Sequence, residues 1–110
     1  MHKLCRVDPQ RREEYLQKVR EFARELRSRF PIEAIFLFGS FAEGRIHEGS
    51  DMDLVIVGDF RERFLDRIGR ILDLTDLPIE PLVYTREEFE QMKKSGNPFI
   101  RTVLATGMKL

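Results

Sequence analysis

The segment FLFGSFAEGRIHEGSDMDLVIV, residues 36–57, decides how the rest of the chain is interpreted. Its apolar first part ends at Gly39-Ser40, and a polar loop then leads to Asp51 and Asp53. The second acid is followed at once by Leu54-Val55-Ile56-Val57, a run typical of a buried strand. Two acidic side chains one residue apart at the start of such a strand need a physical explanation.

Asp51 and Asp53 should point to the same side of a sheet, because side chains along a strand alternate between its two faces. Two rises of about 3.3 Å each separate their Cα atoms, so the carboxylates could approach to about 4 Å. At an effective dielectric constant of about 20 the repulsion is then roughly 4 kcal/mol, which a proton or a cation would relieve. Magnesium suits this role because it prefers hard oxygen ligands, and two such ions about 3.5–4 Å apart serve phosphoryl and nucleotidyl transfer. The alternative is an exposed strand end, where water screens both charges.

Two further features could complete a site around these acids. Backbone N–H groups at the Gly39-Ser40 turn would bind an anion, although Ser40-x-x-Glu43 also satisfies a helix capping box. Glu80, near the start of a later apolar run, could face the aspartates from a neighbouring strand. It could equally be an edge-strand glutamate beside Pro81, which cannot donate to a sheet ladder.

Composition narrows the class of protein. The chain has 110 residues, enough for one domain over residues 1–110. With 19 basic and 19 acidic side chains the net charge is zero, so the protein has no general electrostatic attraction for nucleic acid or membranes. If nucleic acid takes part, we expect it only as the acceptor in a nucleotidyl transfer. A single cysteine, Cys5, excludes an internal disulfide framework. No signal peptide or bilayer-spanning run is visible, and we expect a cytoplasmic protein.

The periodicity of apolar residues predicts alternating helices and strands, and hence an α/β or α+β sheet with helices packed on it. One face of the first helix is apolar, and the other, rich in arginine from Arg11 and Arg12 onward, is either solvated or a phosphate or partner surface. The expected helices span residues 9–30, 60–72, 86–94 and 99–105, with one turn within 40–45, and the expected strands span residues 32–38, 52–57 and 79–84.

Gly39-Ser40, ten residues, then Asp51-x-Asp53 and an apolar strand resemble the signature of the nucleotidyltransferase superfamily that includes DNA polymerase beta. The short chain is similar to the minimal, MNT-type branch, whose members are often encoded beside a HEPN-domain partner. The resemblance implies the nucleotidyltransferase fold, a small mixed β-sheet with helices packed against it. It covers nearly the whole chain, and the Gly-Ser and Asp-x-Asp spacing is its most specific part.

The resemblance also implies roles for individual residues. Asp51 and Asp53 would bind two Mg²⁺ ions. Glu80 matches the third acid of the family, which binds the catalytic ion and helps to deprotonate the attacking group. Gly39 and Ser40 would hold the β- and γ-phosphates of a nucleoside triphosphate.

Three points of this assignment stay open. Arg45, in the loop between the two motifs, would add a charge-assisted phosphate contact, although it could be a surface arginine. The third acid is glutamate where aspartate is commoner, which moves the carboxylate one methylene further from the backbone, and Pro81 follows it. At this length we also expect no extra domain of the kind with which larger relatives grip the base and the acceptor.

The function that the resemblance implies is magnesium-dependent transfer of a nucleoside monophosphate from a nucleoside triphosphate, ATP in the first instance, to an acceptor hydroxyl. The chain would serve as the antitoxin of a HEPN/MNT toxin–antitoxin pair, with a helical HEPN protein as partner. The alternative is an interaction module that neutralises a HEPN ribonuclease by covering it, without catalysis. Self-association is compatible with either function.

Overall fold

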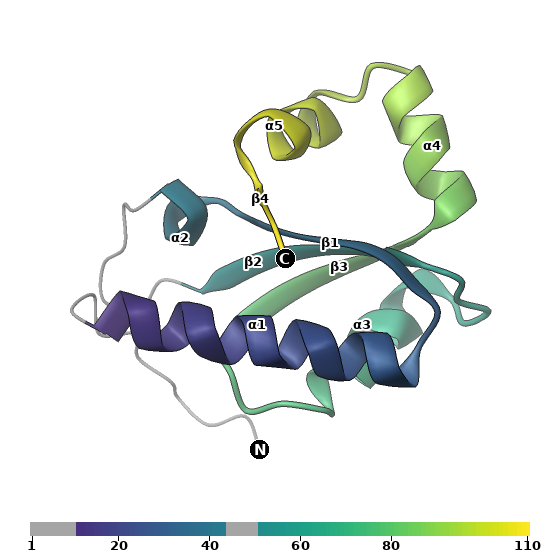
Figure 1. Ribbon diagram of the computed structural model, residues 1–110. Coiled ribbons are helices and arrows are strands. Elements are labelled where there is room, and N and C mark those ends of the chain that lie inside the picture. Colours follow the sequence, from purple (N-terminus) through teal and green to yellow (C-terminus); the bar gives the residue numbers. More distant parts are fainter. Residues whose placement is uncertain (1–10, 44–50) are drawn as a thin grey trace.

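A computed structural model describes residues 11–43 and 51–110 of the chain (Figure 1). No helix in this part of the chain combines the length and the apolar character needed to cross a lipid bilayer. The elements follow one another as α1 (Arg12–Arg29), β1 (Ile32–Phe38), α2 (Ser40–Glu43), β2 (Met52–Gly58), α3 (Phe64–Leu72), β3 (Ile79–Thr85), α4 (Arg86–Lys94), α5 (Pro98–Thr106) and β4 (Met108–Lys109).

The described strands form one mixed sheet in the order β3-β2-β1-β4. β1 pairs antiparallel with both β2 and β4, whereas β2 and β3 run parallel. The parallel pair is connected through α3, as a crossover between parallel strands requires. The predicted mixed sheet with packed helices is therefore confirmed.

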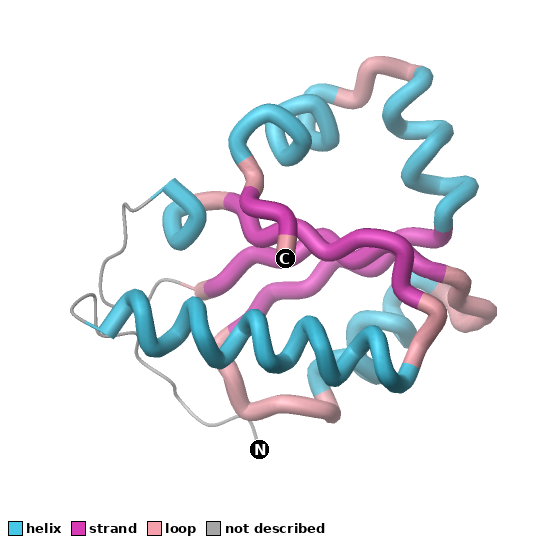
Figure 2. The backbone as a smooth tube through the Cα atoms, viewed as in Figure 1, coloured by secondary structure: helices cyan, strands magenta, loops and turns pink. Residues whose placement is uncertain are grey.

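Helices cover both faces of this sheet, with α1 and α3 on one side and α4 and α5 on the other (Figures 1 and 2). Side chains of β2 alternate between the two layers, as the period of a strand requires. Leu54 and Ile56 pack with α1 and with Ile71 of α3. Val55 and Val57 pack instead with side chains of α4 and α5, among them Phe89.

The edge strand β3 is protected by α3. Arg67 of α3 is only 7% exposed. Its Nη1 donates to the buried carbonyl of Val83 at 3.2 Å and to Oε1 of Glu88 at 2.7 Å. These bonds join α3 to β3 and to the first turn of α4. The sheet edge beside Val83 is thereby closed to pairing with another strand.

Local sequence signals set several of the boundaries. Thr85 and Glu88 form the predicted capping box at the start of α4, and the side chain of Asn97 caps α5. The third helix differs from the prediction, because it begins at Phe64 and not at Phe60. Phe60 is nevertheless buried and lies 5.6 Å from the ring of Phe30, centroid to centroid, so its apolar character reflects packing from a loop.

The strand β4 was not predicted. It has two residues, Met108 and Lys109, which pair with Leu37 and Phe36 of β1. Gly107 lets the chain turn from the end of α5 into β4, because a Cβ there would overlap the carbonyl oxygen of Val103. The predicted helix start at Asp8-Pro9 lies outside the described residues.

Candidate active site

Three side chains form a row across the sheet. The register pairs Phe38 of β1 with Asp53 of β2, and Asp53 with Glu80 of β3. Directly paired residues project from the same face, and this is the face covered by α4 and α5, because Val55, two residues after Asp53, packs there. We call Asp53 and Glu80 the acid pair. As predicted, Glu80 lies beside Asp53 on the neighbouring strand.

The acid pair is electrostatically crowded. Partial burial raises the pKa of Asp53 from its ordinary 3.8 to about 6, assisted by a hydrogen bond with the Glu80 carboxyl and by the charges of Glu80 and Asp51. Asp51 lies just before β2 and is exposed. That both aspartates project to the same side stays a prediction.

Gly39 brings the turn after β1 against this acid pair. Its φ is +75°, a conformation that L side chains rarely adopt. A Cβ built on Gly39 would lie 2.5 Å from Oδ2 of Asp53. Glycine therefore suits the backbone conformation and leaves the Asp53 carboxylate in place, and the two halves of the motif recognised in the sequence meet in the fold.

The rest of the predicted phosphate turn is described in part. Ser40 is half-buried and is the first residue of α2. Phe41 is fully buried and packs edge-on to Tyr15 of α1 at 6.1 Å between ring centroids. Arg45 and the side chain of Glu43 lie outside the described residues, as does the loop up to residue 50.

The donor set suits a magnesium ion better than a softer metal. Asp51, Asp53 and Glu80 offer only carboxylate oxygens, which are hard ligands. Within residues 11–43 and 51–110, no three side chains of His, Cys, Asp or Glu already meet around one point. The acid pair is in contact, and the charge of Asp51 acts on it from the end of the strand. A divalent cation would stabilise the ionised form of Asp53, which burial first and the neighbouring carboxylates second disfavour.

Two contacts near the acid pair were not predicted. The ring of Phe38 packs edge-on against Phe99 of α5, with 5.3 Å between centroids. Arg12 of α1 donates two hydrogen bonds to the carbonyl of Phe41. The sequence offers no local signal for either contact, because both depend on which helix lies over the end of β1.

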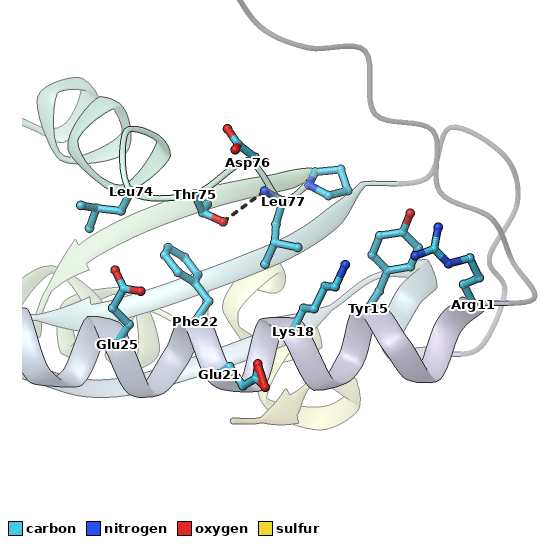
Figure 3. Close-up of a pocket in the computed structure, with 11 residues that line it drawn as sticks. Arg11, Tyr15, Lys18, Glu21, Phe22, Glu25, Leu74, Thr75, Asp76 and Leu77 are labelled. Carbon is cyan, nitrogen blue, oxygen red and sulfur yellow. Dashed lines mark hydrogen bonds between the residues drawn. The ribbon is translucent and has the colours of Figure 1, made fainter.

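A groove of about 480 Å³ lies between α1 and the loop before β3 (Figure 3). Its floor is apolar, with Phe22 and Leu77 among the lining side chains, and its rim carries charges of both signs, including Lys18 and Asp76. None of the predicted site residues within 11–43 and 51–110 lines it. It ends at Pro78, whose carbonyl accepts a hydrogen bond from the backbone N–H of Met52 at 2.8 Å, so it approaches the strand that carries the aspartates.

Comparison with known proteins gives consistent results. Residues 19–105 match the family described as "Nucleotidyltransferase domain". The chain is 36% identical over 95 residues to a protein of Methanocaldococcus jannaschii named "Putative protein adenylyltransferase", which covers 84% of this chain and 93% of the relative.

Two solved structures share the fold. A crystal structure of a putative nucleotidyltransferase from Sulfolobus solfataricus superposes with a TM-score of 0.62 at 20% identity, over 81% of this chain and 85% of that chain. A crystal structure described as a toxin–antitoxin with AMP-PNP superposes with a TM-score of 0.55 at 18% identity, over 84% of this chain and 69% of that chain.

Proposed function

This chain belongs to the nucleotidyltransferase domain family and is a nucleotidyltransferase, and from that premise we propose that it transfers a nucleoside monophosphate from ATP to an acceptor hydroxyl at the acid pair. The observation that carries the proposal is the contact between the two halves of the motif. The Asp53 carboxylate lies where a side chain of residue 39 would be, and Glu80 is paired with Asp53 across the sheet. A triphosphate held at the turn would therefore lie beside the carboxylates.

Asp51, Asp53 and Glu80 are the residues that would hold two Mg²⁺ ions. When bound there, the ions would supply charge neutralisation for the attacking oxygen and for the departing pyrophosphate. The fit rests on the all-carboxylate donor set and on the register that pairs Glu80 with Asp53; the pKa of Asp53 is raised by burial and, to a smaller extent, by Glu80 and Asp51, so a cation there would favour the ionised carboxylate.

The protein's own groups bind and orient the reactants. The backbone N–H groups at Gly39 and Ser40 would bind the β- and γ-phosphates, and the Ser40 hydroxyl adds a donor. Arg45 is a further candidate for a phosphate contact. The acceptor oxygen forms the new bond to the α-phosphorus while the bond to the β-phosphate bridge breaks, and pyrophosphate leaves. Glu80 would accept the acceptor's proton, and alignment of the two reactants would supply much of the acceleration.

A protein is the acceptor class that the relatives favour. The relative from M. jannaschii is named as a protein adenylyltransferase, and one structural neighbour comes from a toxin–antitoxin complex. We therefore propose that the chain is the antitoxin of such a pair, that the partner is a helical HEPN toxin, and that a hydroxyl-bearing side chain of the partner receives the adenylyl group.

Transfer of label from α-labelled ATP tests the catalytic proposal. The purified chain is incubated with Mg²⁺, labelled ATP and the product of the adjacent reading frame. The wild type should label the partner, whereas Asp51→Asn and Asp53→Asn should lose at least about 100-fold in rate, in line with the loss of an essential charged group. Asp59→Asn, which removes a carboxylate just beyond the opposite end of β2, is the matched control and should transfer normally. Equal labelling by all four proteins would contradict the proposal.

The toxin–antitoxin neighbour also supports a second function, in which the chain neutralises its partner by binding alone. Growth rescue separates the two. A double Asp51→Asn/Asp53→Asn variant that still binds the toxin and fully rescues growth favours occlusion. A folded, binding variant that no longer rescues favours chemistry.

A further inference from the structure

Arg12, at the start of α1, is bonded to a distant part of the chain. Its Nε and Nη2 both donate to the carbonyl oxygen of Phe41, at 3.2 Å and 2.9 Å. Its side chain is 28% exposed, whereas Arg11 and Lys18 on the same helix are each 48% exposed. Arg12 is therefore not simply part of the solvated arginine face of α1.

The acceptor of these bonds is in α2. The carbonyls of a four-residue helix have no partners within the helix, so an external donor matters here more than in a long helix. The Phe41 side chain is buried and packs against Tyr15. Phe41 is thus fixed through its side chain by the core and through its carbonyl by Arg12.

The other end of the turn is fixed as well. Gly39 lies against Oδ2 of Asp53 with no room for a side chain. Between the two fixed residues, Gly39 and Phe41, lies only Ser40. The direction of the Ser40 N–H is therefore constrained from both sides, by the close packing of Gly39 on Asp53 and by the bonds of Arg12 to Phe41.

We propose that Arg12 is a positioning residue for triphosphate binding, which holds the Gly39–Phe41 turn in its binding geometry through the paired hydrogen bonds to Phe41. The proposal rests on the function proposed above for this turn. A guanidinium presents two donors in one plane to a single oxygen, whereas a lysine ammonium is a point charge on a flexible stem. Without the pair, the turn must be ordered when the nucleotide binds, and affinity falls.

Steady-state kinetics separates positioning from a general structural role. Arg12→Lys and Arg12→Gln should raise KM for ATP about tenfold, the equivalent of one charge-assisted hydrogen bond at the low end of its range. Their kcat and KM for the acceptor should stay within about threefold, because the acid pair is untouched. Arg24→Gln, on an exposed position of the same helix, is the matched control and should equal the wild type.

Two outcomes would overturn the proposal. One is a wild-type KM for ATP in Arg12→Lys, because charge without paired donors would then suffice. The other is a parallel loss of kcat and of both KM values that follows the fraction of unfolded protein. Hydrogen exchange of the Gly39 and Ser40 amides in the nucleotide-free protein is a readout that needs no catalysis. Exchange should be faster in Arg12→Lys than in Arg24→Gln, and equal rates reject the role of Arg12 even if the chain transfers nothing.

Discussion

Replacing Asp53 by asparagine should abolish transfer and at the same time stabilise the metal-free protein. The pKa of Asp53 is raised from 3.8 to about 6 by burial, by its hydrogen bond with Glu80 and by two neighbouring charges. A raised carboxyl pKa means that the folded state is favoured by protonation: stability is fully present below pH 4 and is lost as the pH rises through 6. The loss above pH 6 is at most about 3 kcal/mol, at about 1.4 kcal/mol for each tenfold change in the ionisation constant, and it is smaller to the extent that water screens the partly exposed carboxylate. An asparagine carries no charge and can still donate to Glu80, so it removes this loss.

Urea unfolding in the presence of a chelator measures the effect. At pH 7.5 the free energy of unfolding of Asp53→Asn should exceed that of the wild type by up to about 3 kcal/mol, and near pH 4 the two should agree. Asp59→Asn changes the net charge by the same amount and should show no such gain. Adding Mg²⁺ at tenfold its Kd should then stabilise the wild type by about 1.4 kcal/mol and leave Asp53→Asn unchanged. A variant no more stable than the wild type at pH 7.5 would show that the acid pair is not strained, and the argument for a cation there would fail.

Three other predictions concern the turn and the links between α3, β3 and α4. Gly39→Ala and Gly96→Ala both place a side chain at positive φ, +75° and +71°, but only at residue 39 would the Cβ meet a carboxylate oxygen. Both variants should lose about 1–2 kcal/mol of unfolding free energy in urea. Only Gly39→Ala should also lose transfer activity. Arg67→Met leaves the buried Val83 carbonyl without its donor and should lower the free energy of unfolding by about 3 kcal/mol. Burial alone would raise the pKa of Glu88, but hydrogen bonds, the strongest from Arg67, outweigh burial and hold the pKa below 4.5. Glu88→Gln should therefore lower the free energy of unfolding at pH 7, as measured in urea. The loss should shrink as the pH falls through the lowered pKa.

Most of the fold could be predicted because its elements carry local signals. The strand Ile32–Phe38 has the predicted bounds, and the capping box at Thr85 marks the start of α4. The failures are tertiary in origin. Phe60 has the spacing of a helical residue, but it packs on Phe30 from a loop. β4 is only two residues long, too short for any periodicity, and exists because it pairs with β1.

In the candidate site, too, some features follow from local sequence signals and others depend on tertiary contacts. Local spacing predicts that Asp51 and Asp53 project to the same side, and this stays a prediction; the charge of Asp51 contributes to the raised pKa of Asp53. Glycine at position 39 was expected for a close approach, but its neighbour was expected to be a phosphate, and in the protein alone it is Asp53. Arg12 could not be selected from the other arginines of its helix, because its partner lies 29 residues away in the sequence.

Pro81 illustrates how an apparent weakness at the site is explained by the sheet. Pro81 follows the third acid, and a proline can disturb strand pairing because it has no backbone N–H to donate to a sheet ladder. In the edge strand of a parallel pair, the N–H and C=O groups of one residue point toward the neighbouring strand. Those of the next residue point away from the sheet. Arg67 reaches the carbonyl of Val83 from α3, so Val83 faces the outer edge, and Pro81, two residues earlier, faces the same way. The N–H that proline lacks would therefore lie on the side where β3 has no neighbouring strand. Glu80 is the adjacent residue, so its backbone N–H and C=O point the other way, toward β2. Replacing Pro81 would therefore leave the register that pairs Glu80 with Asp53 intact.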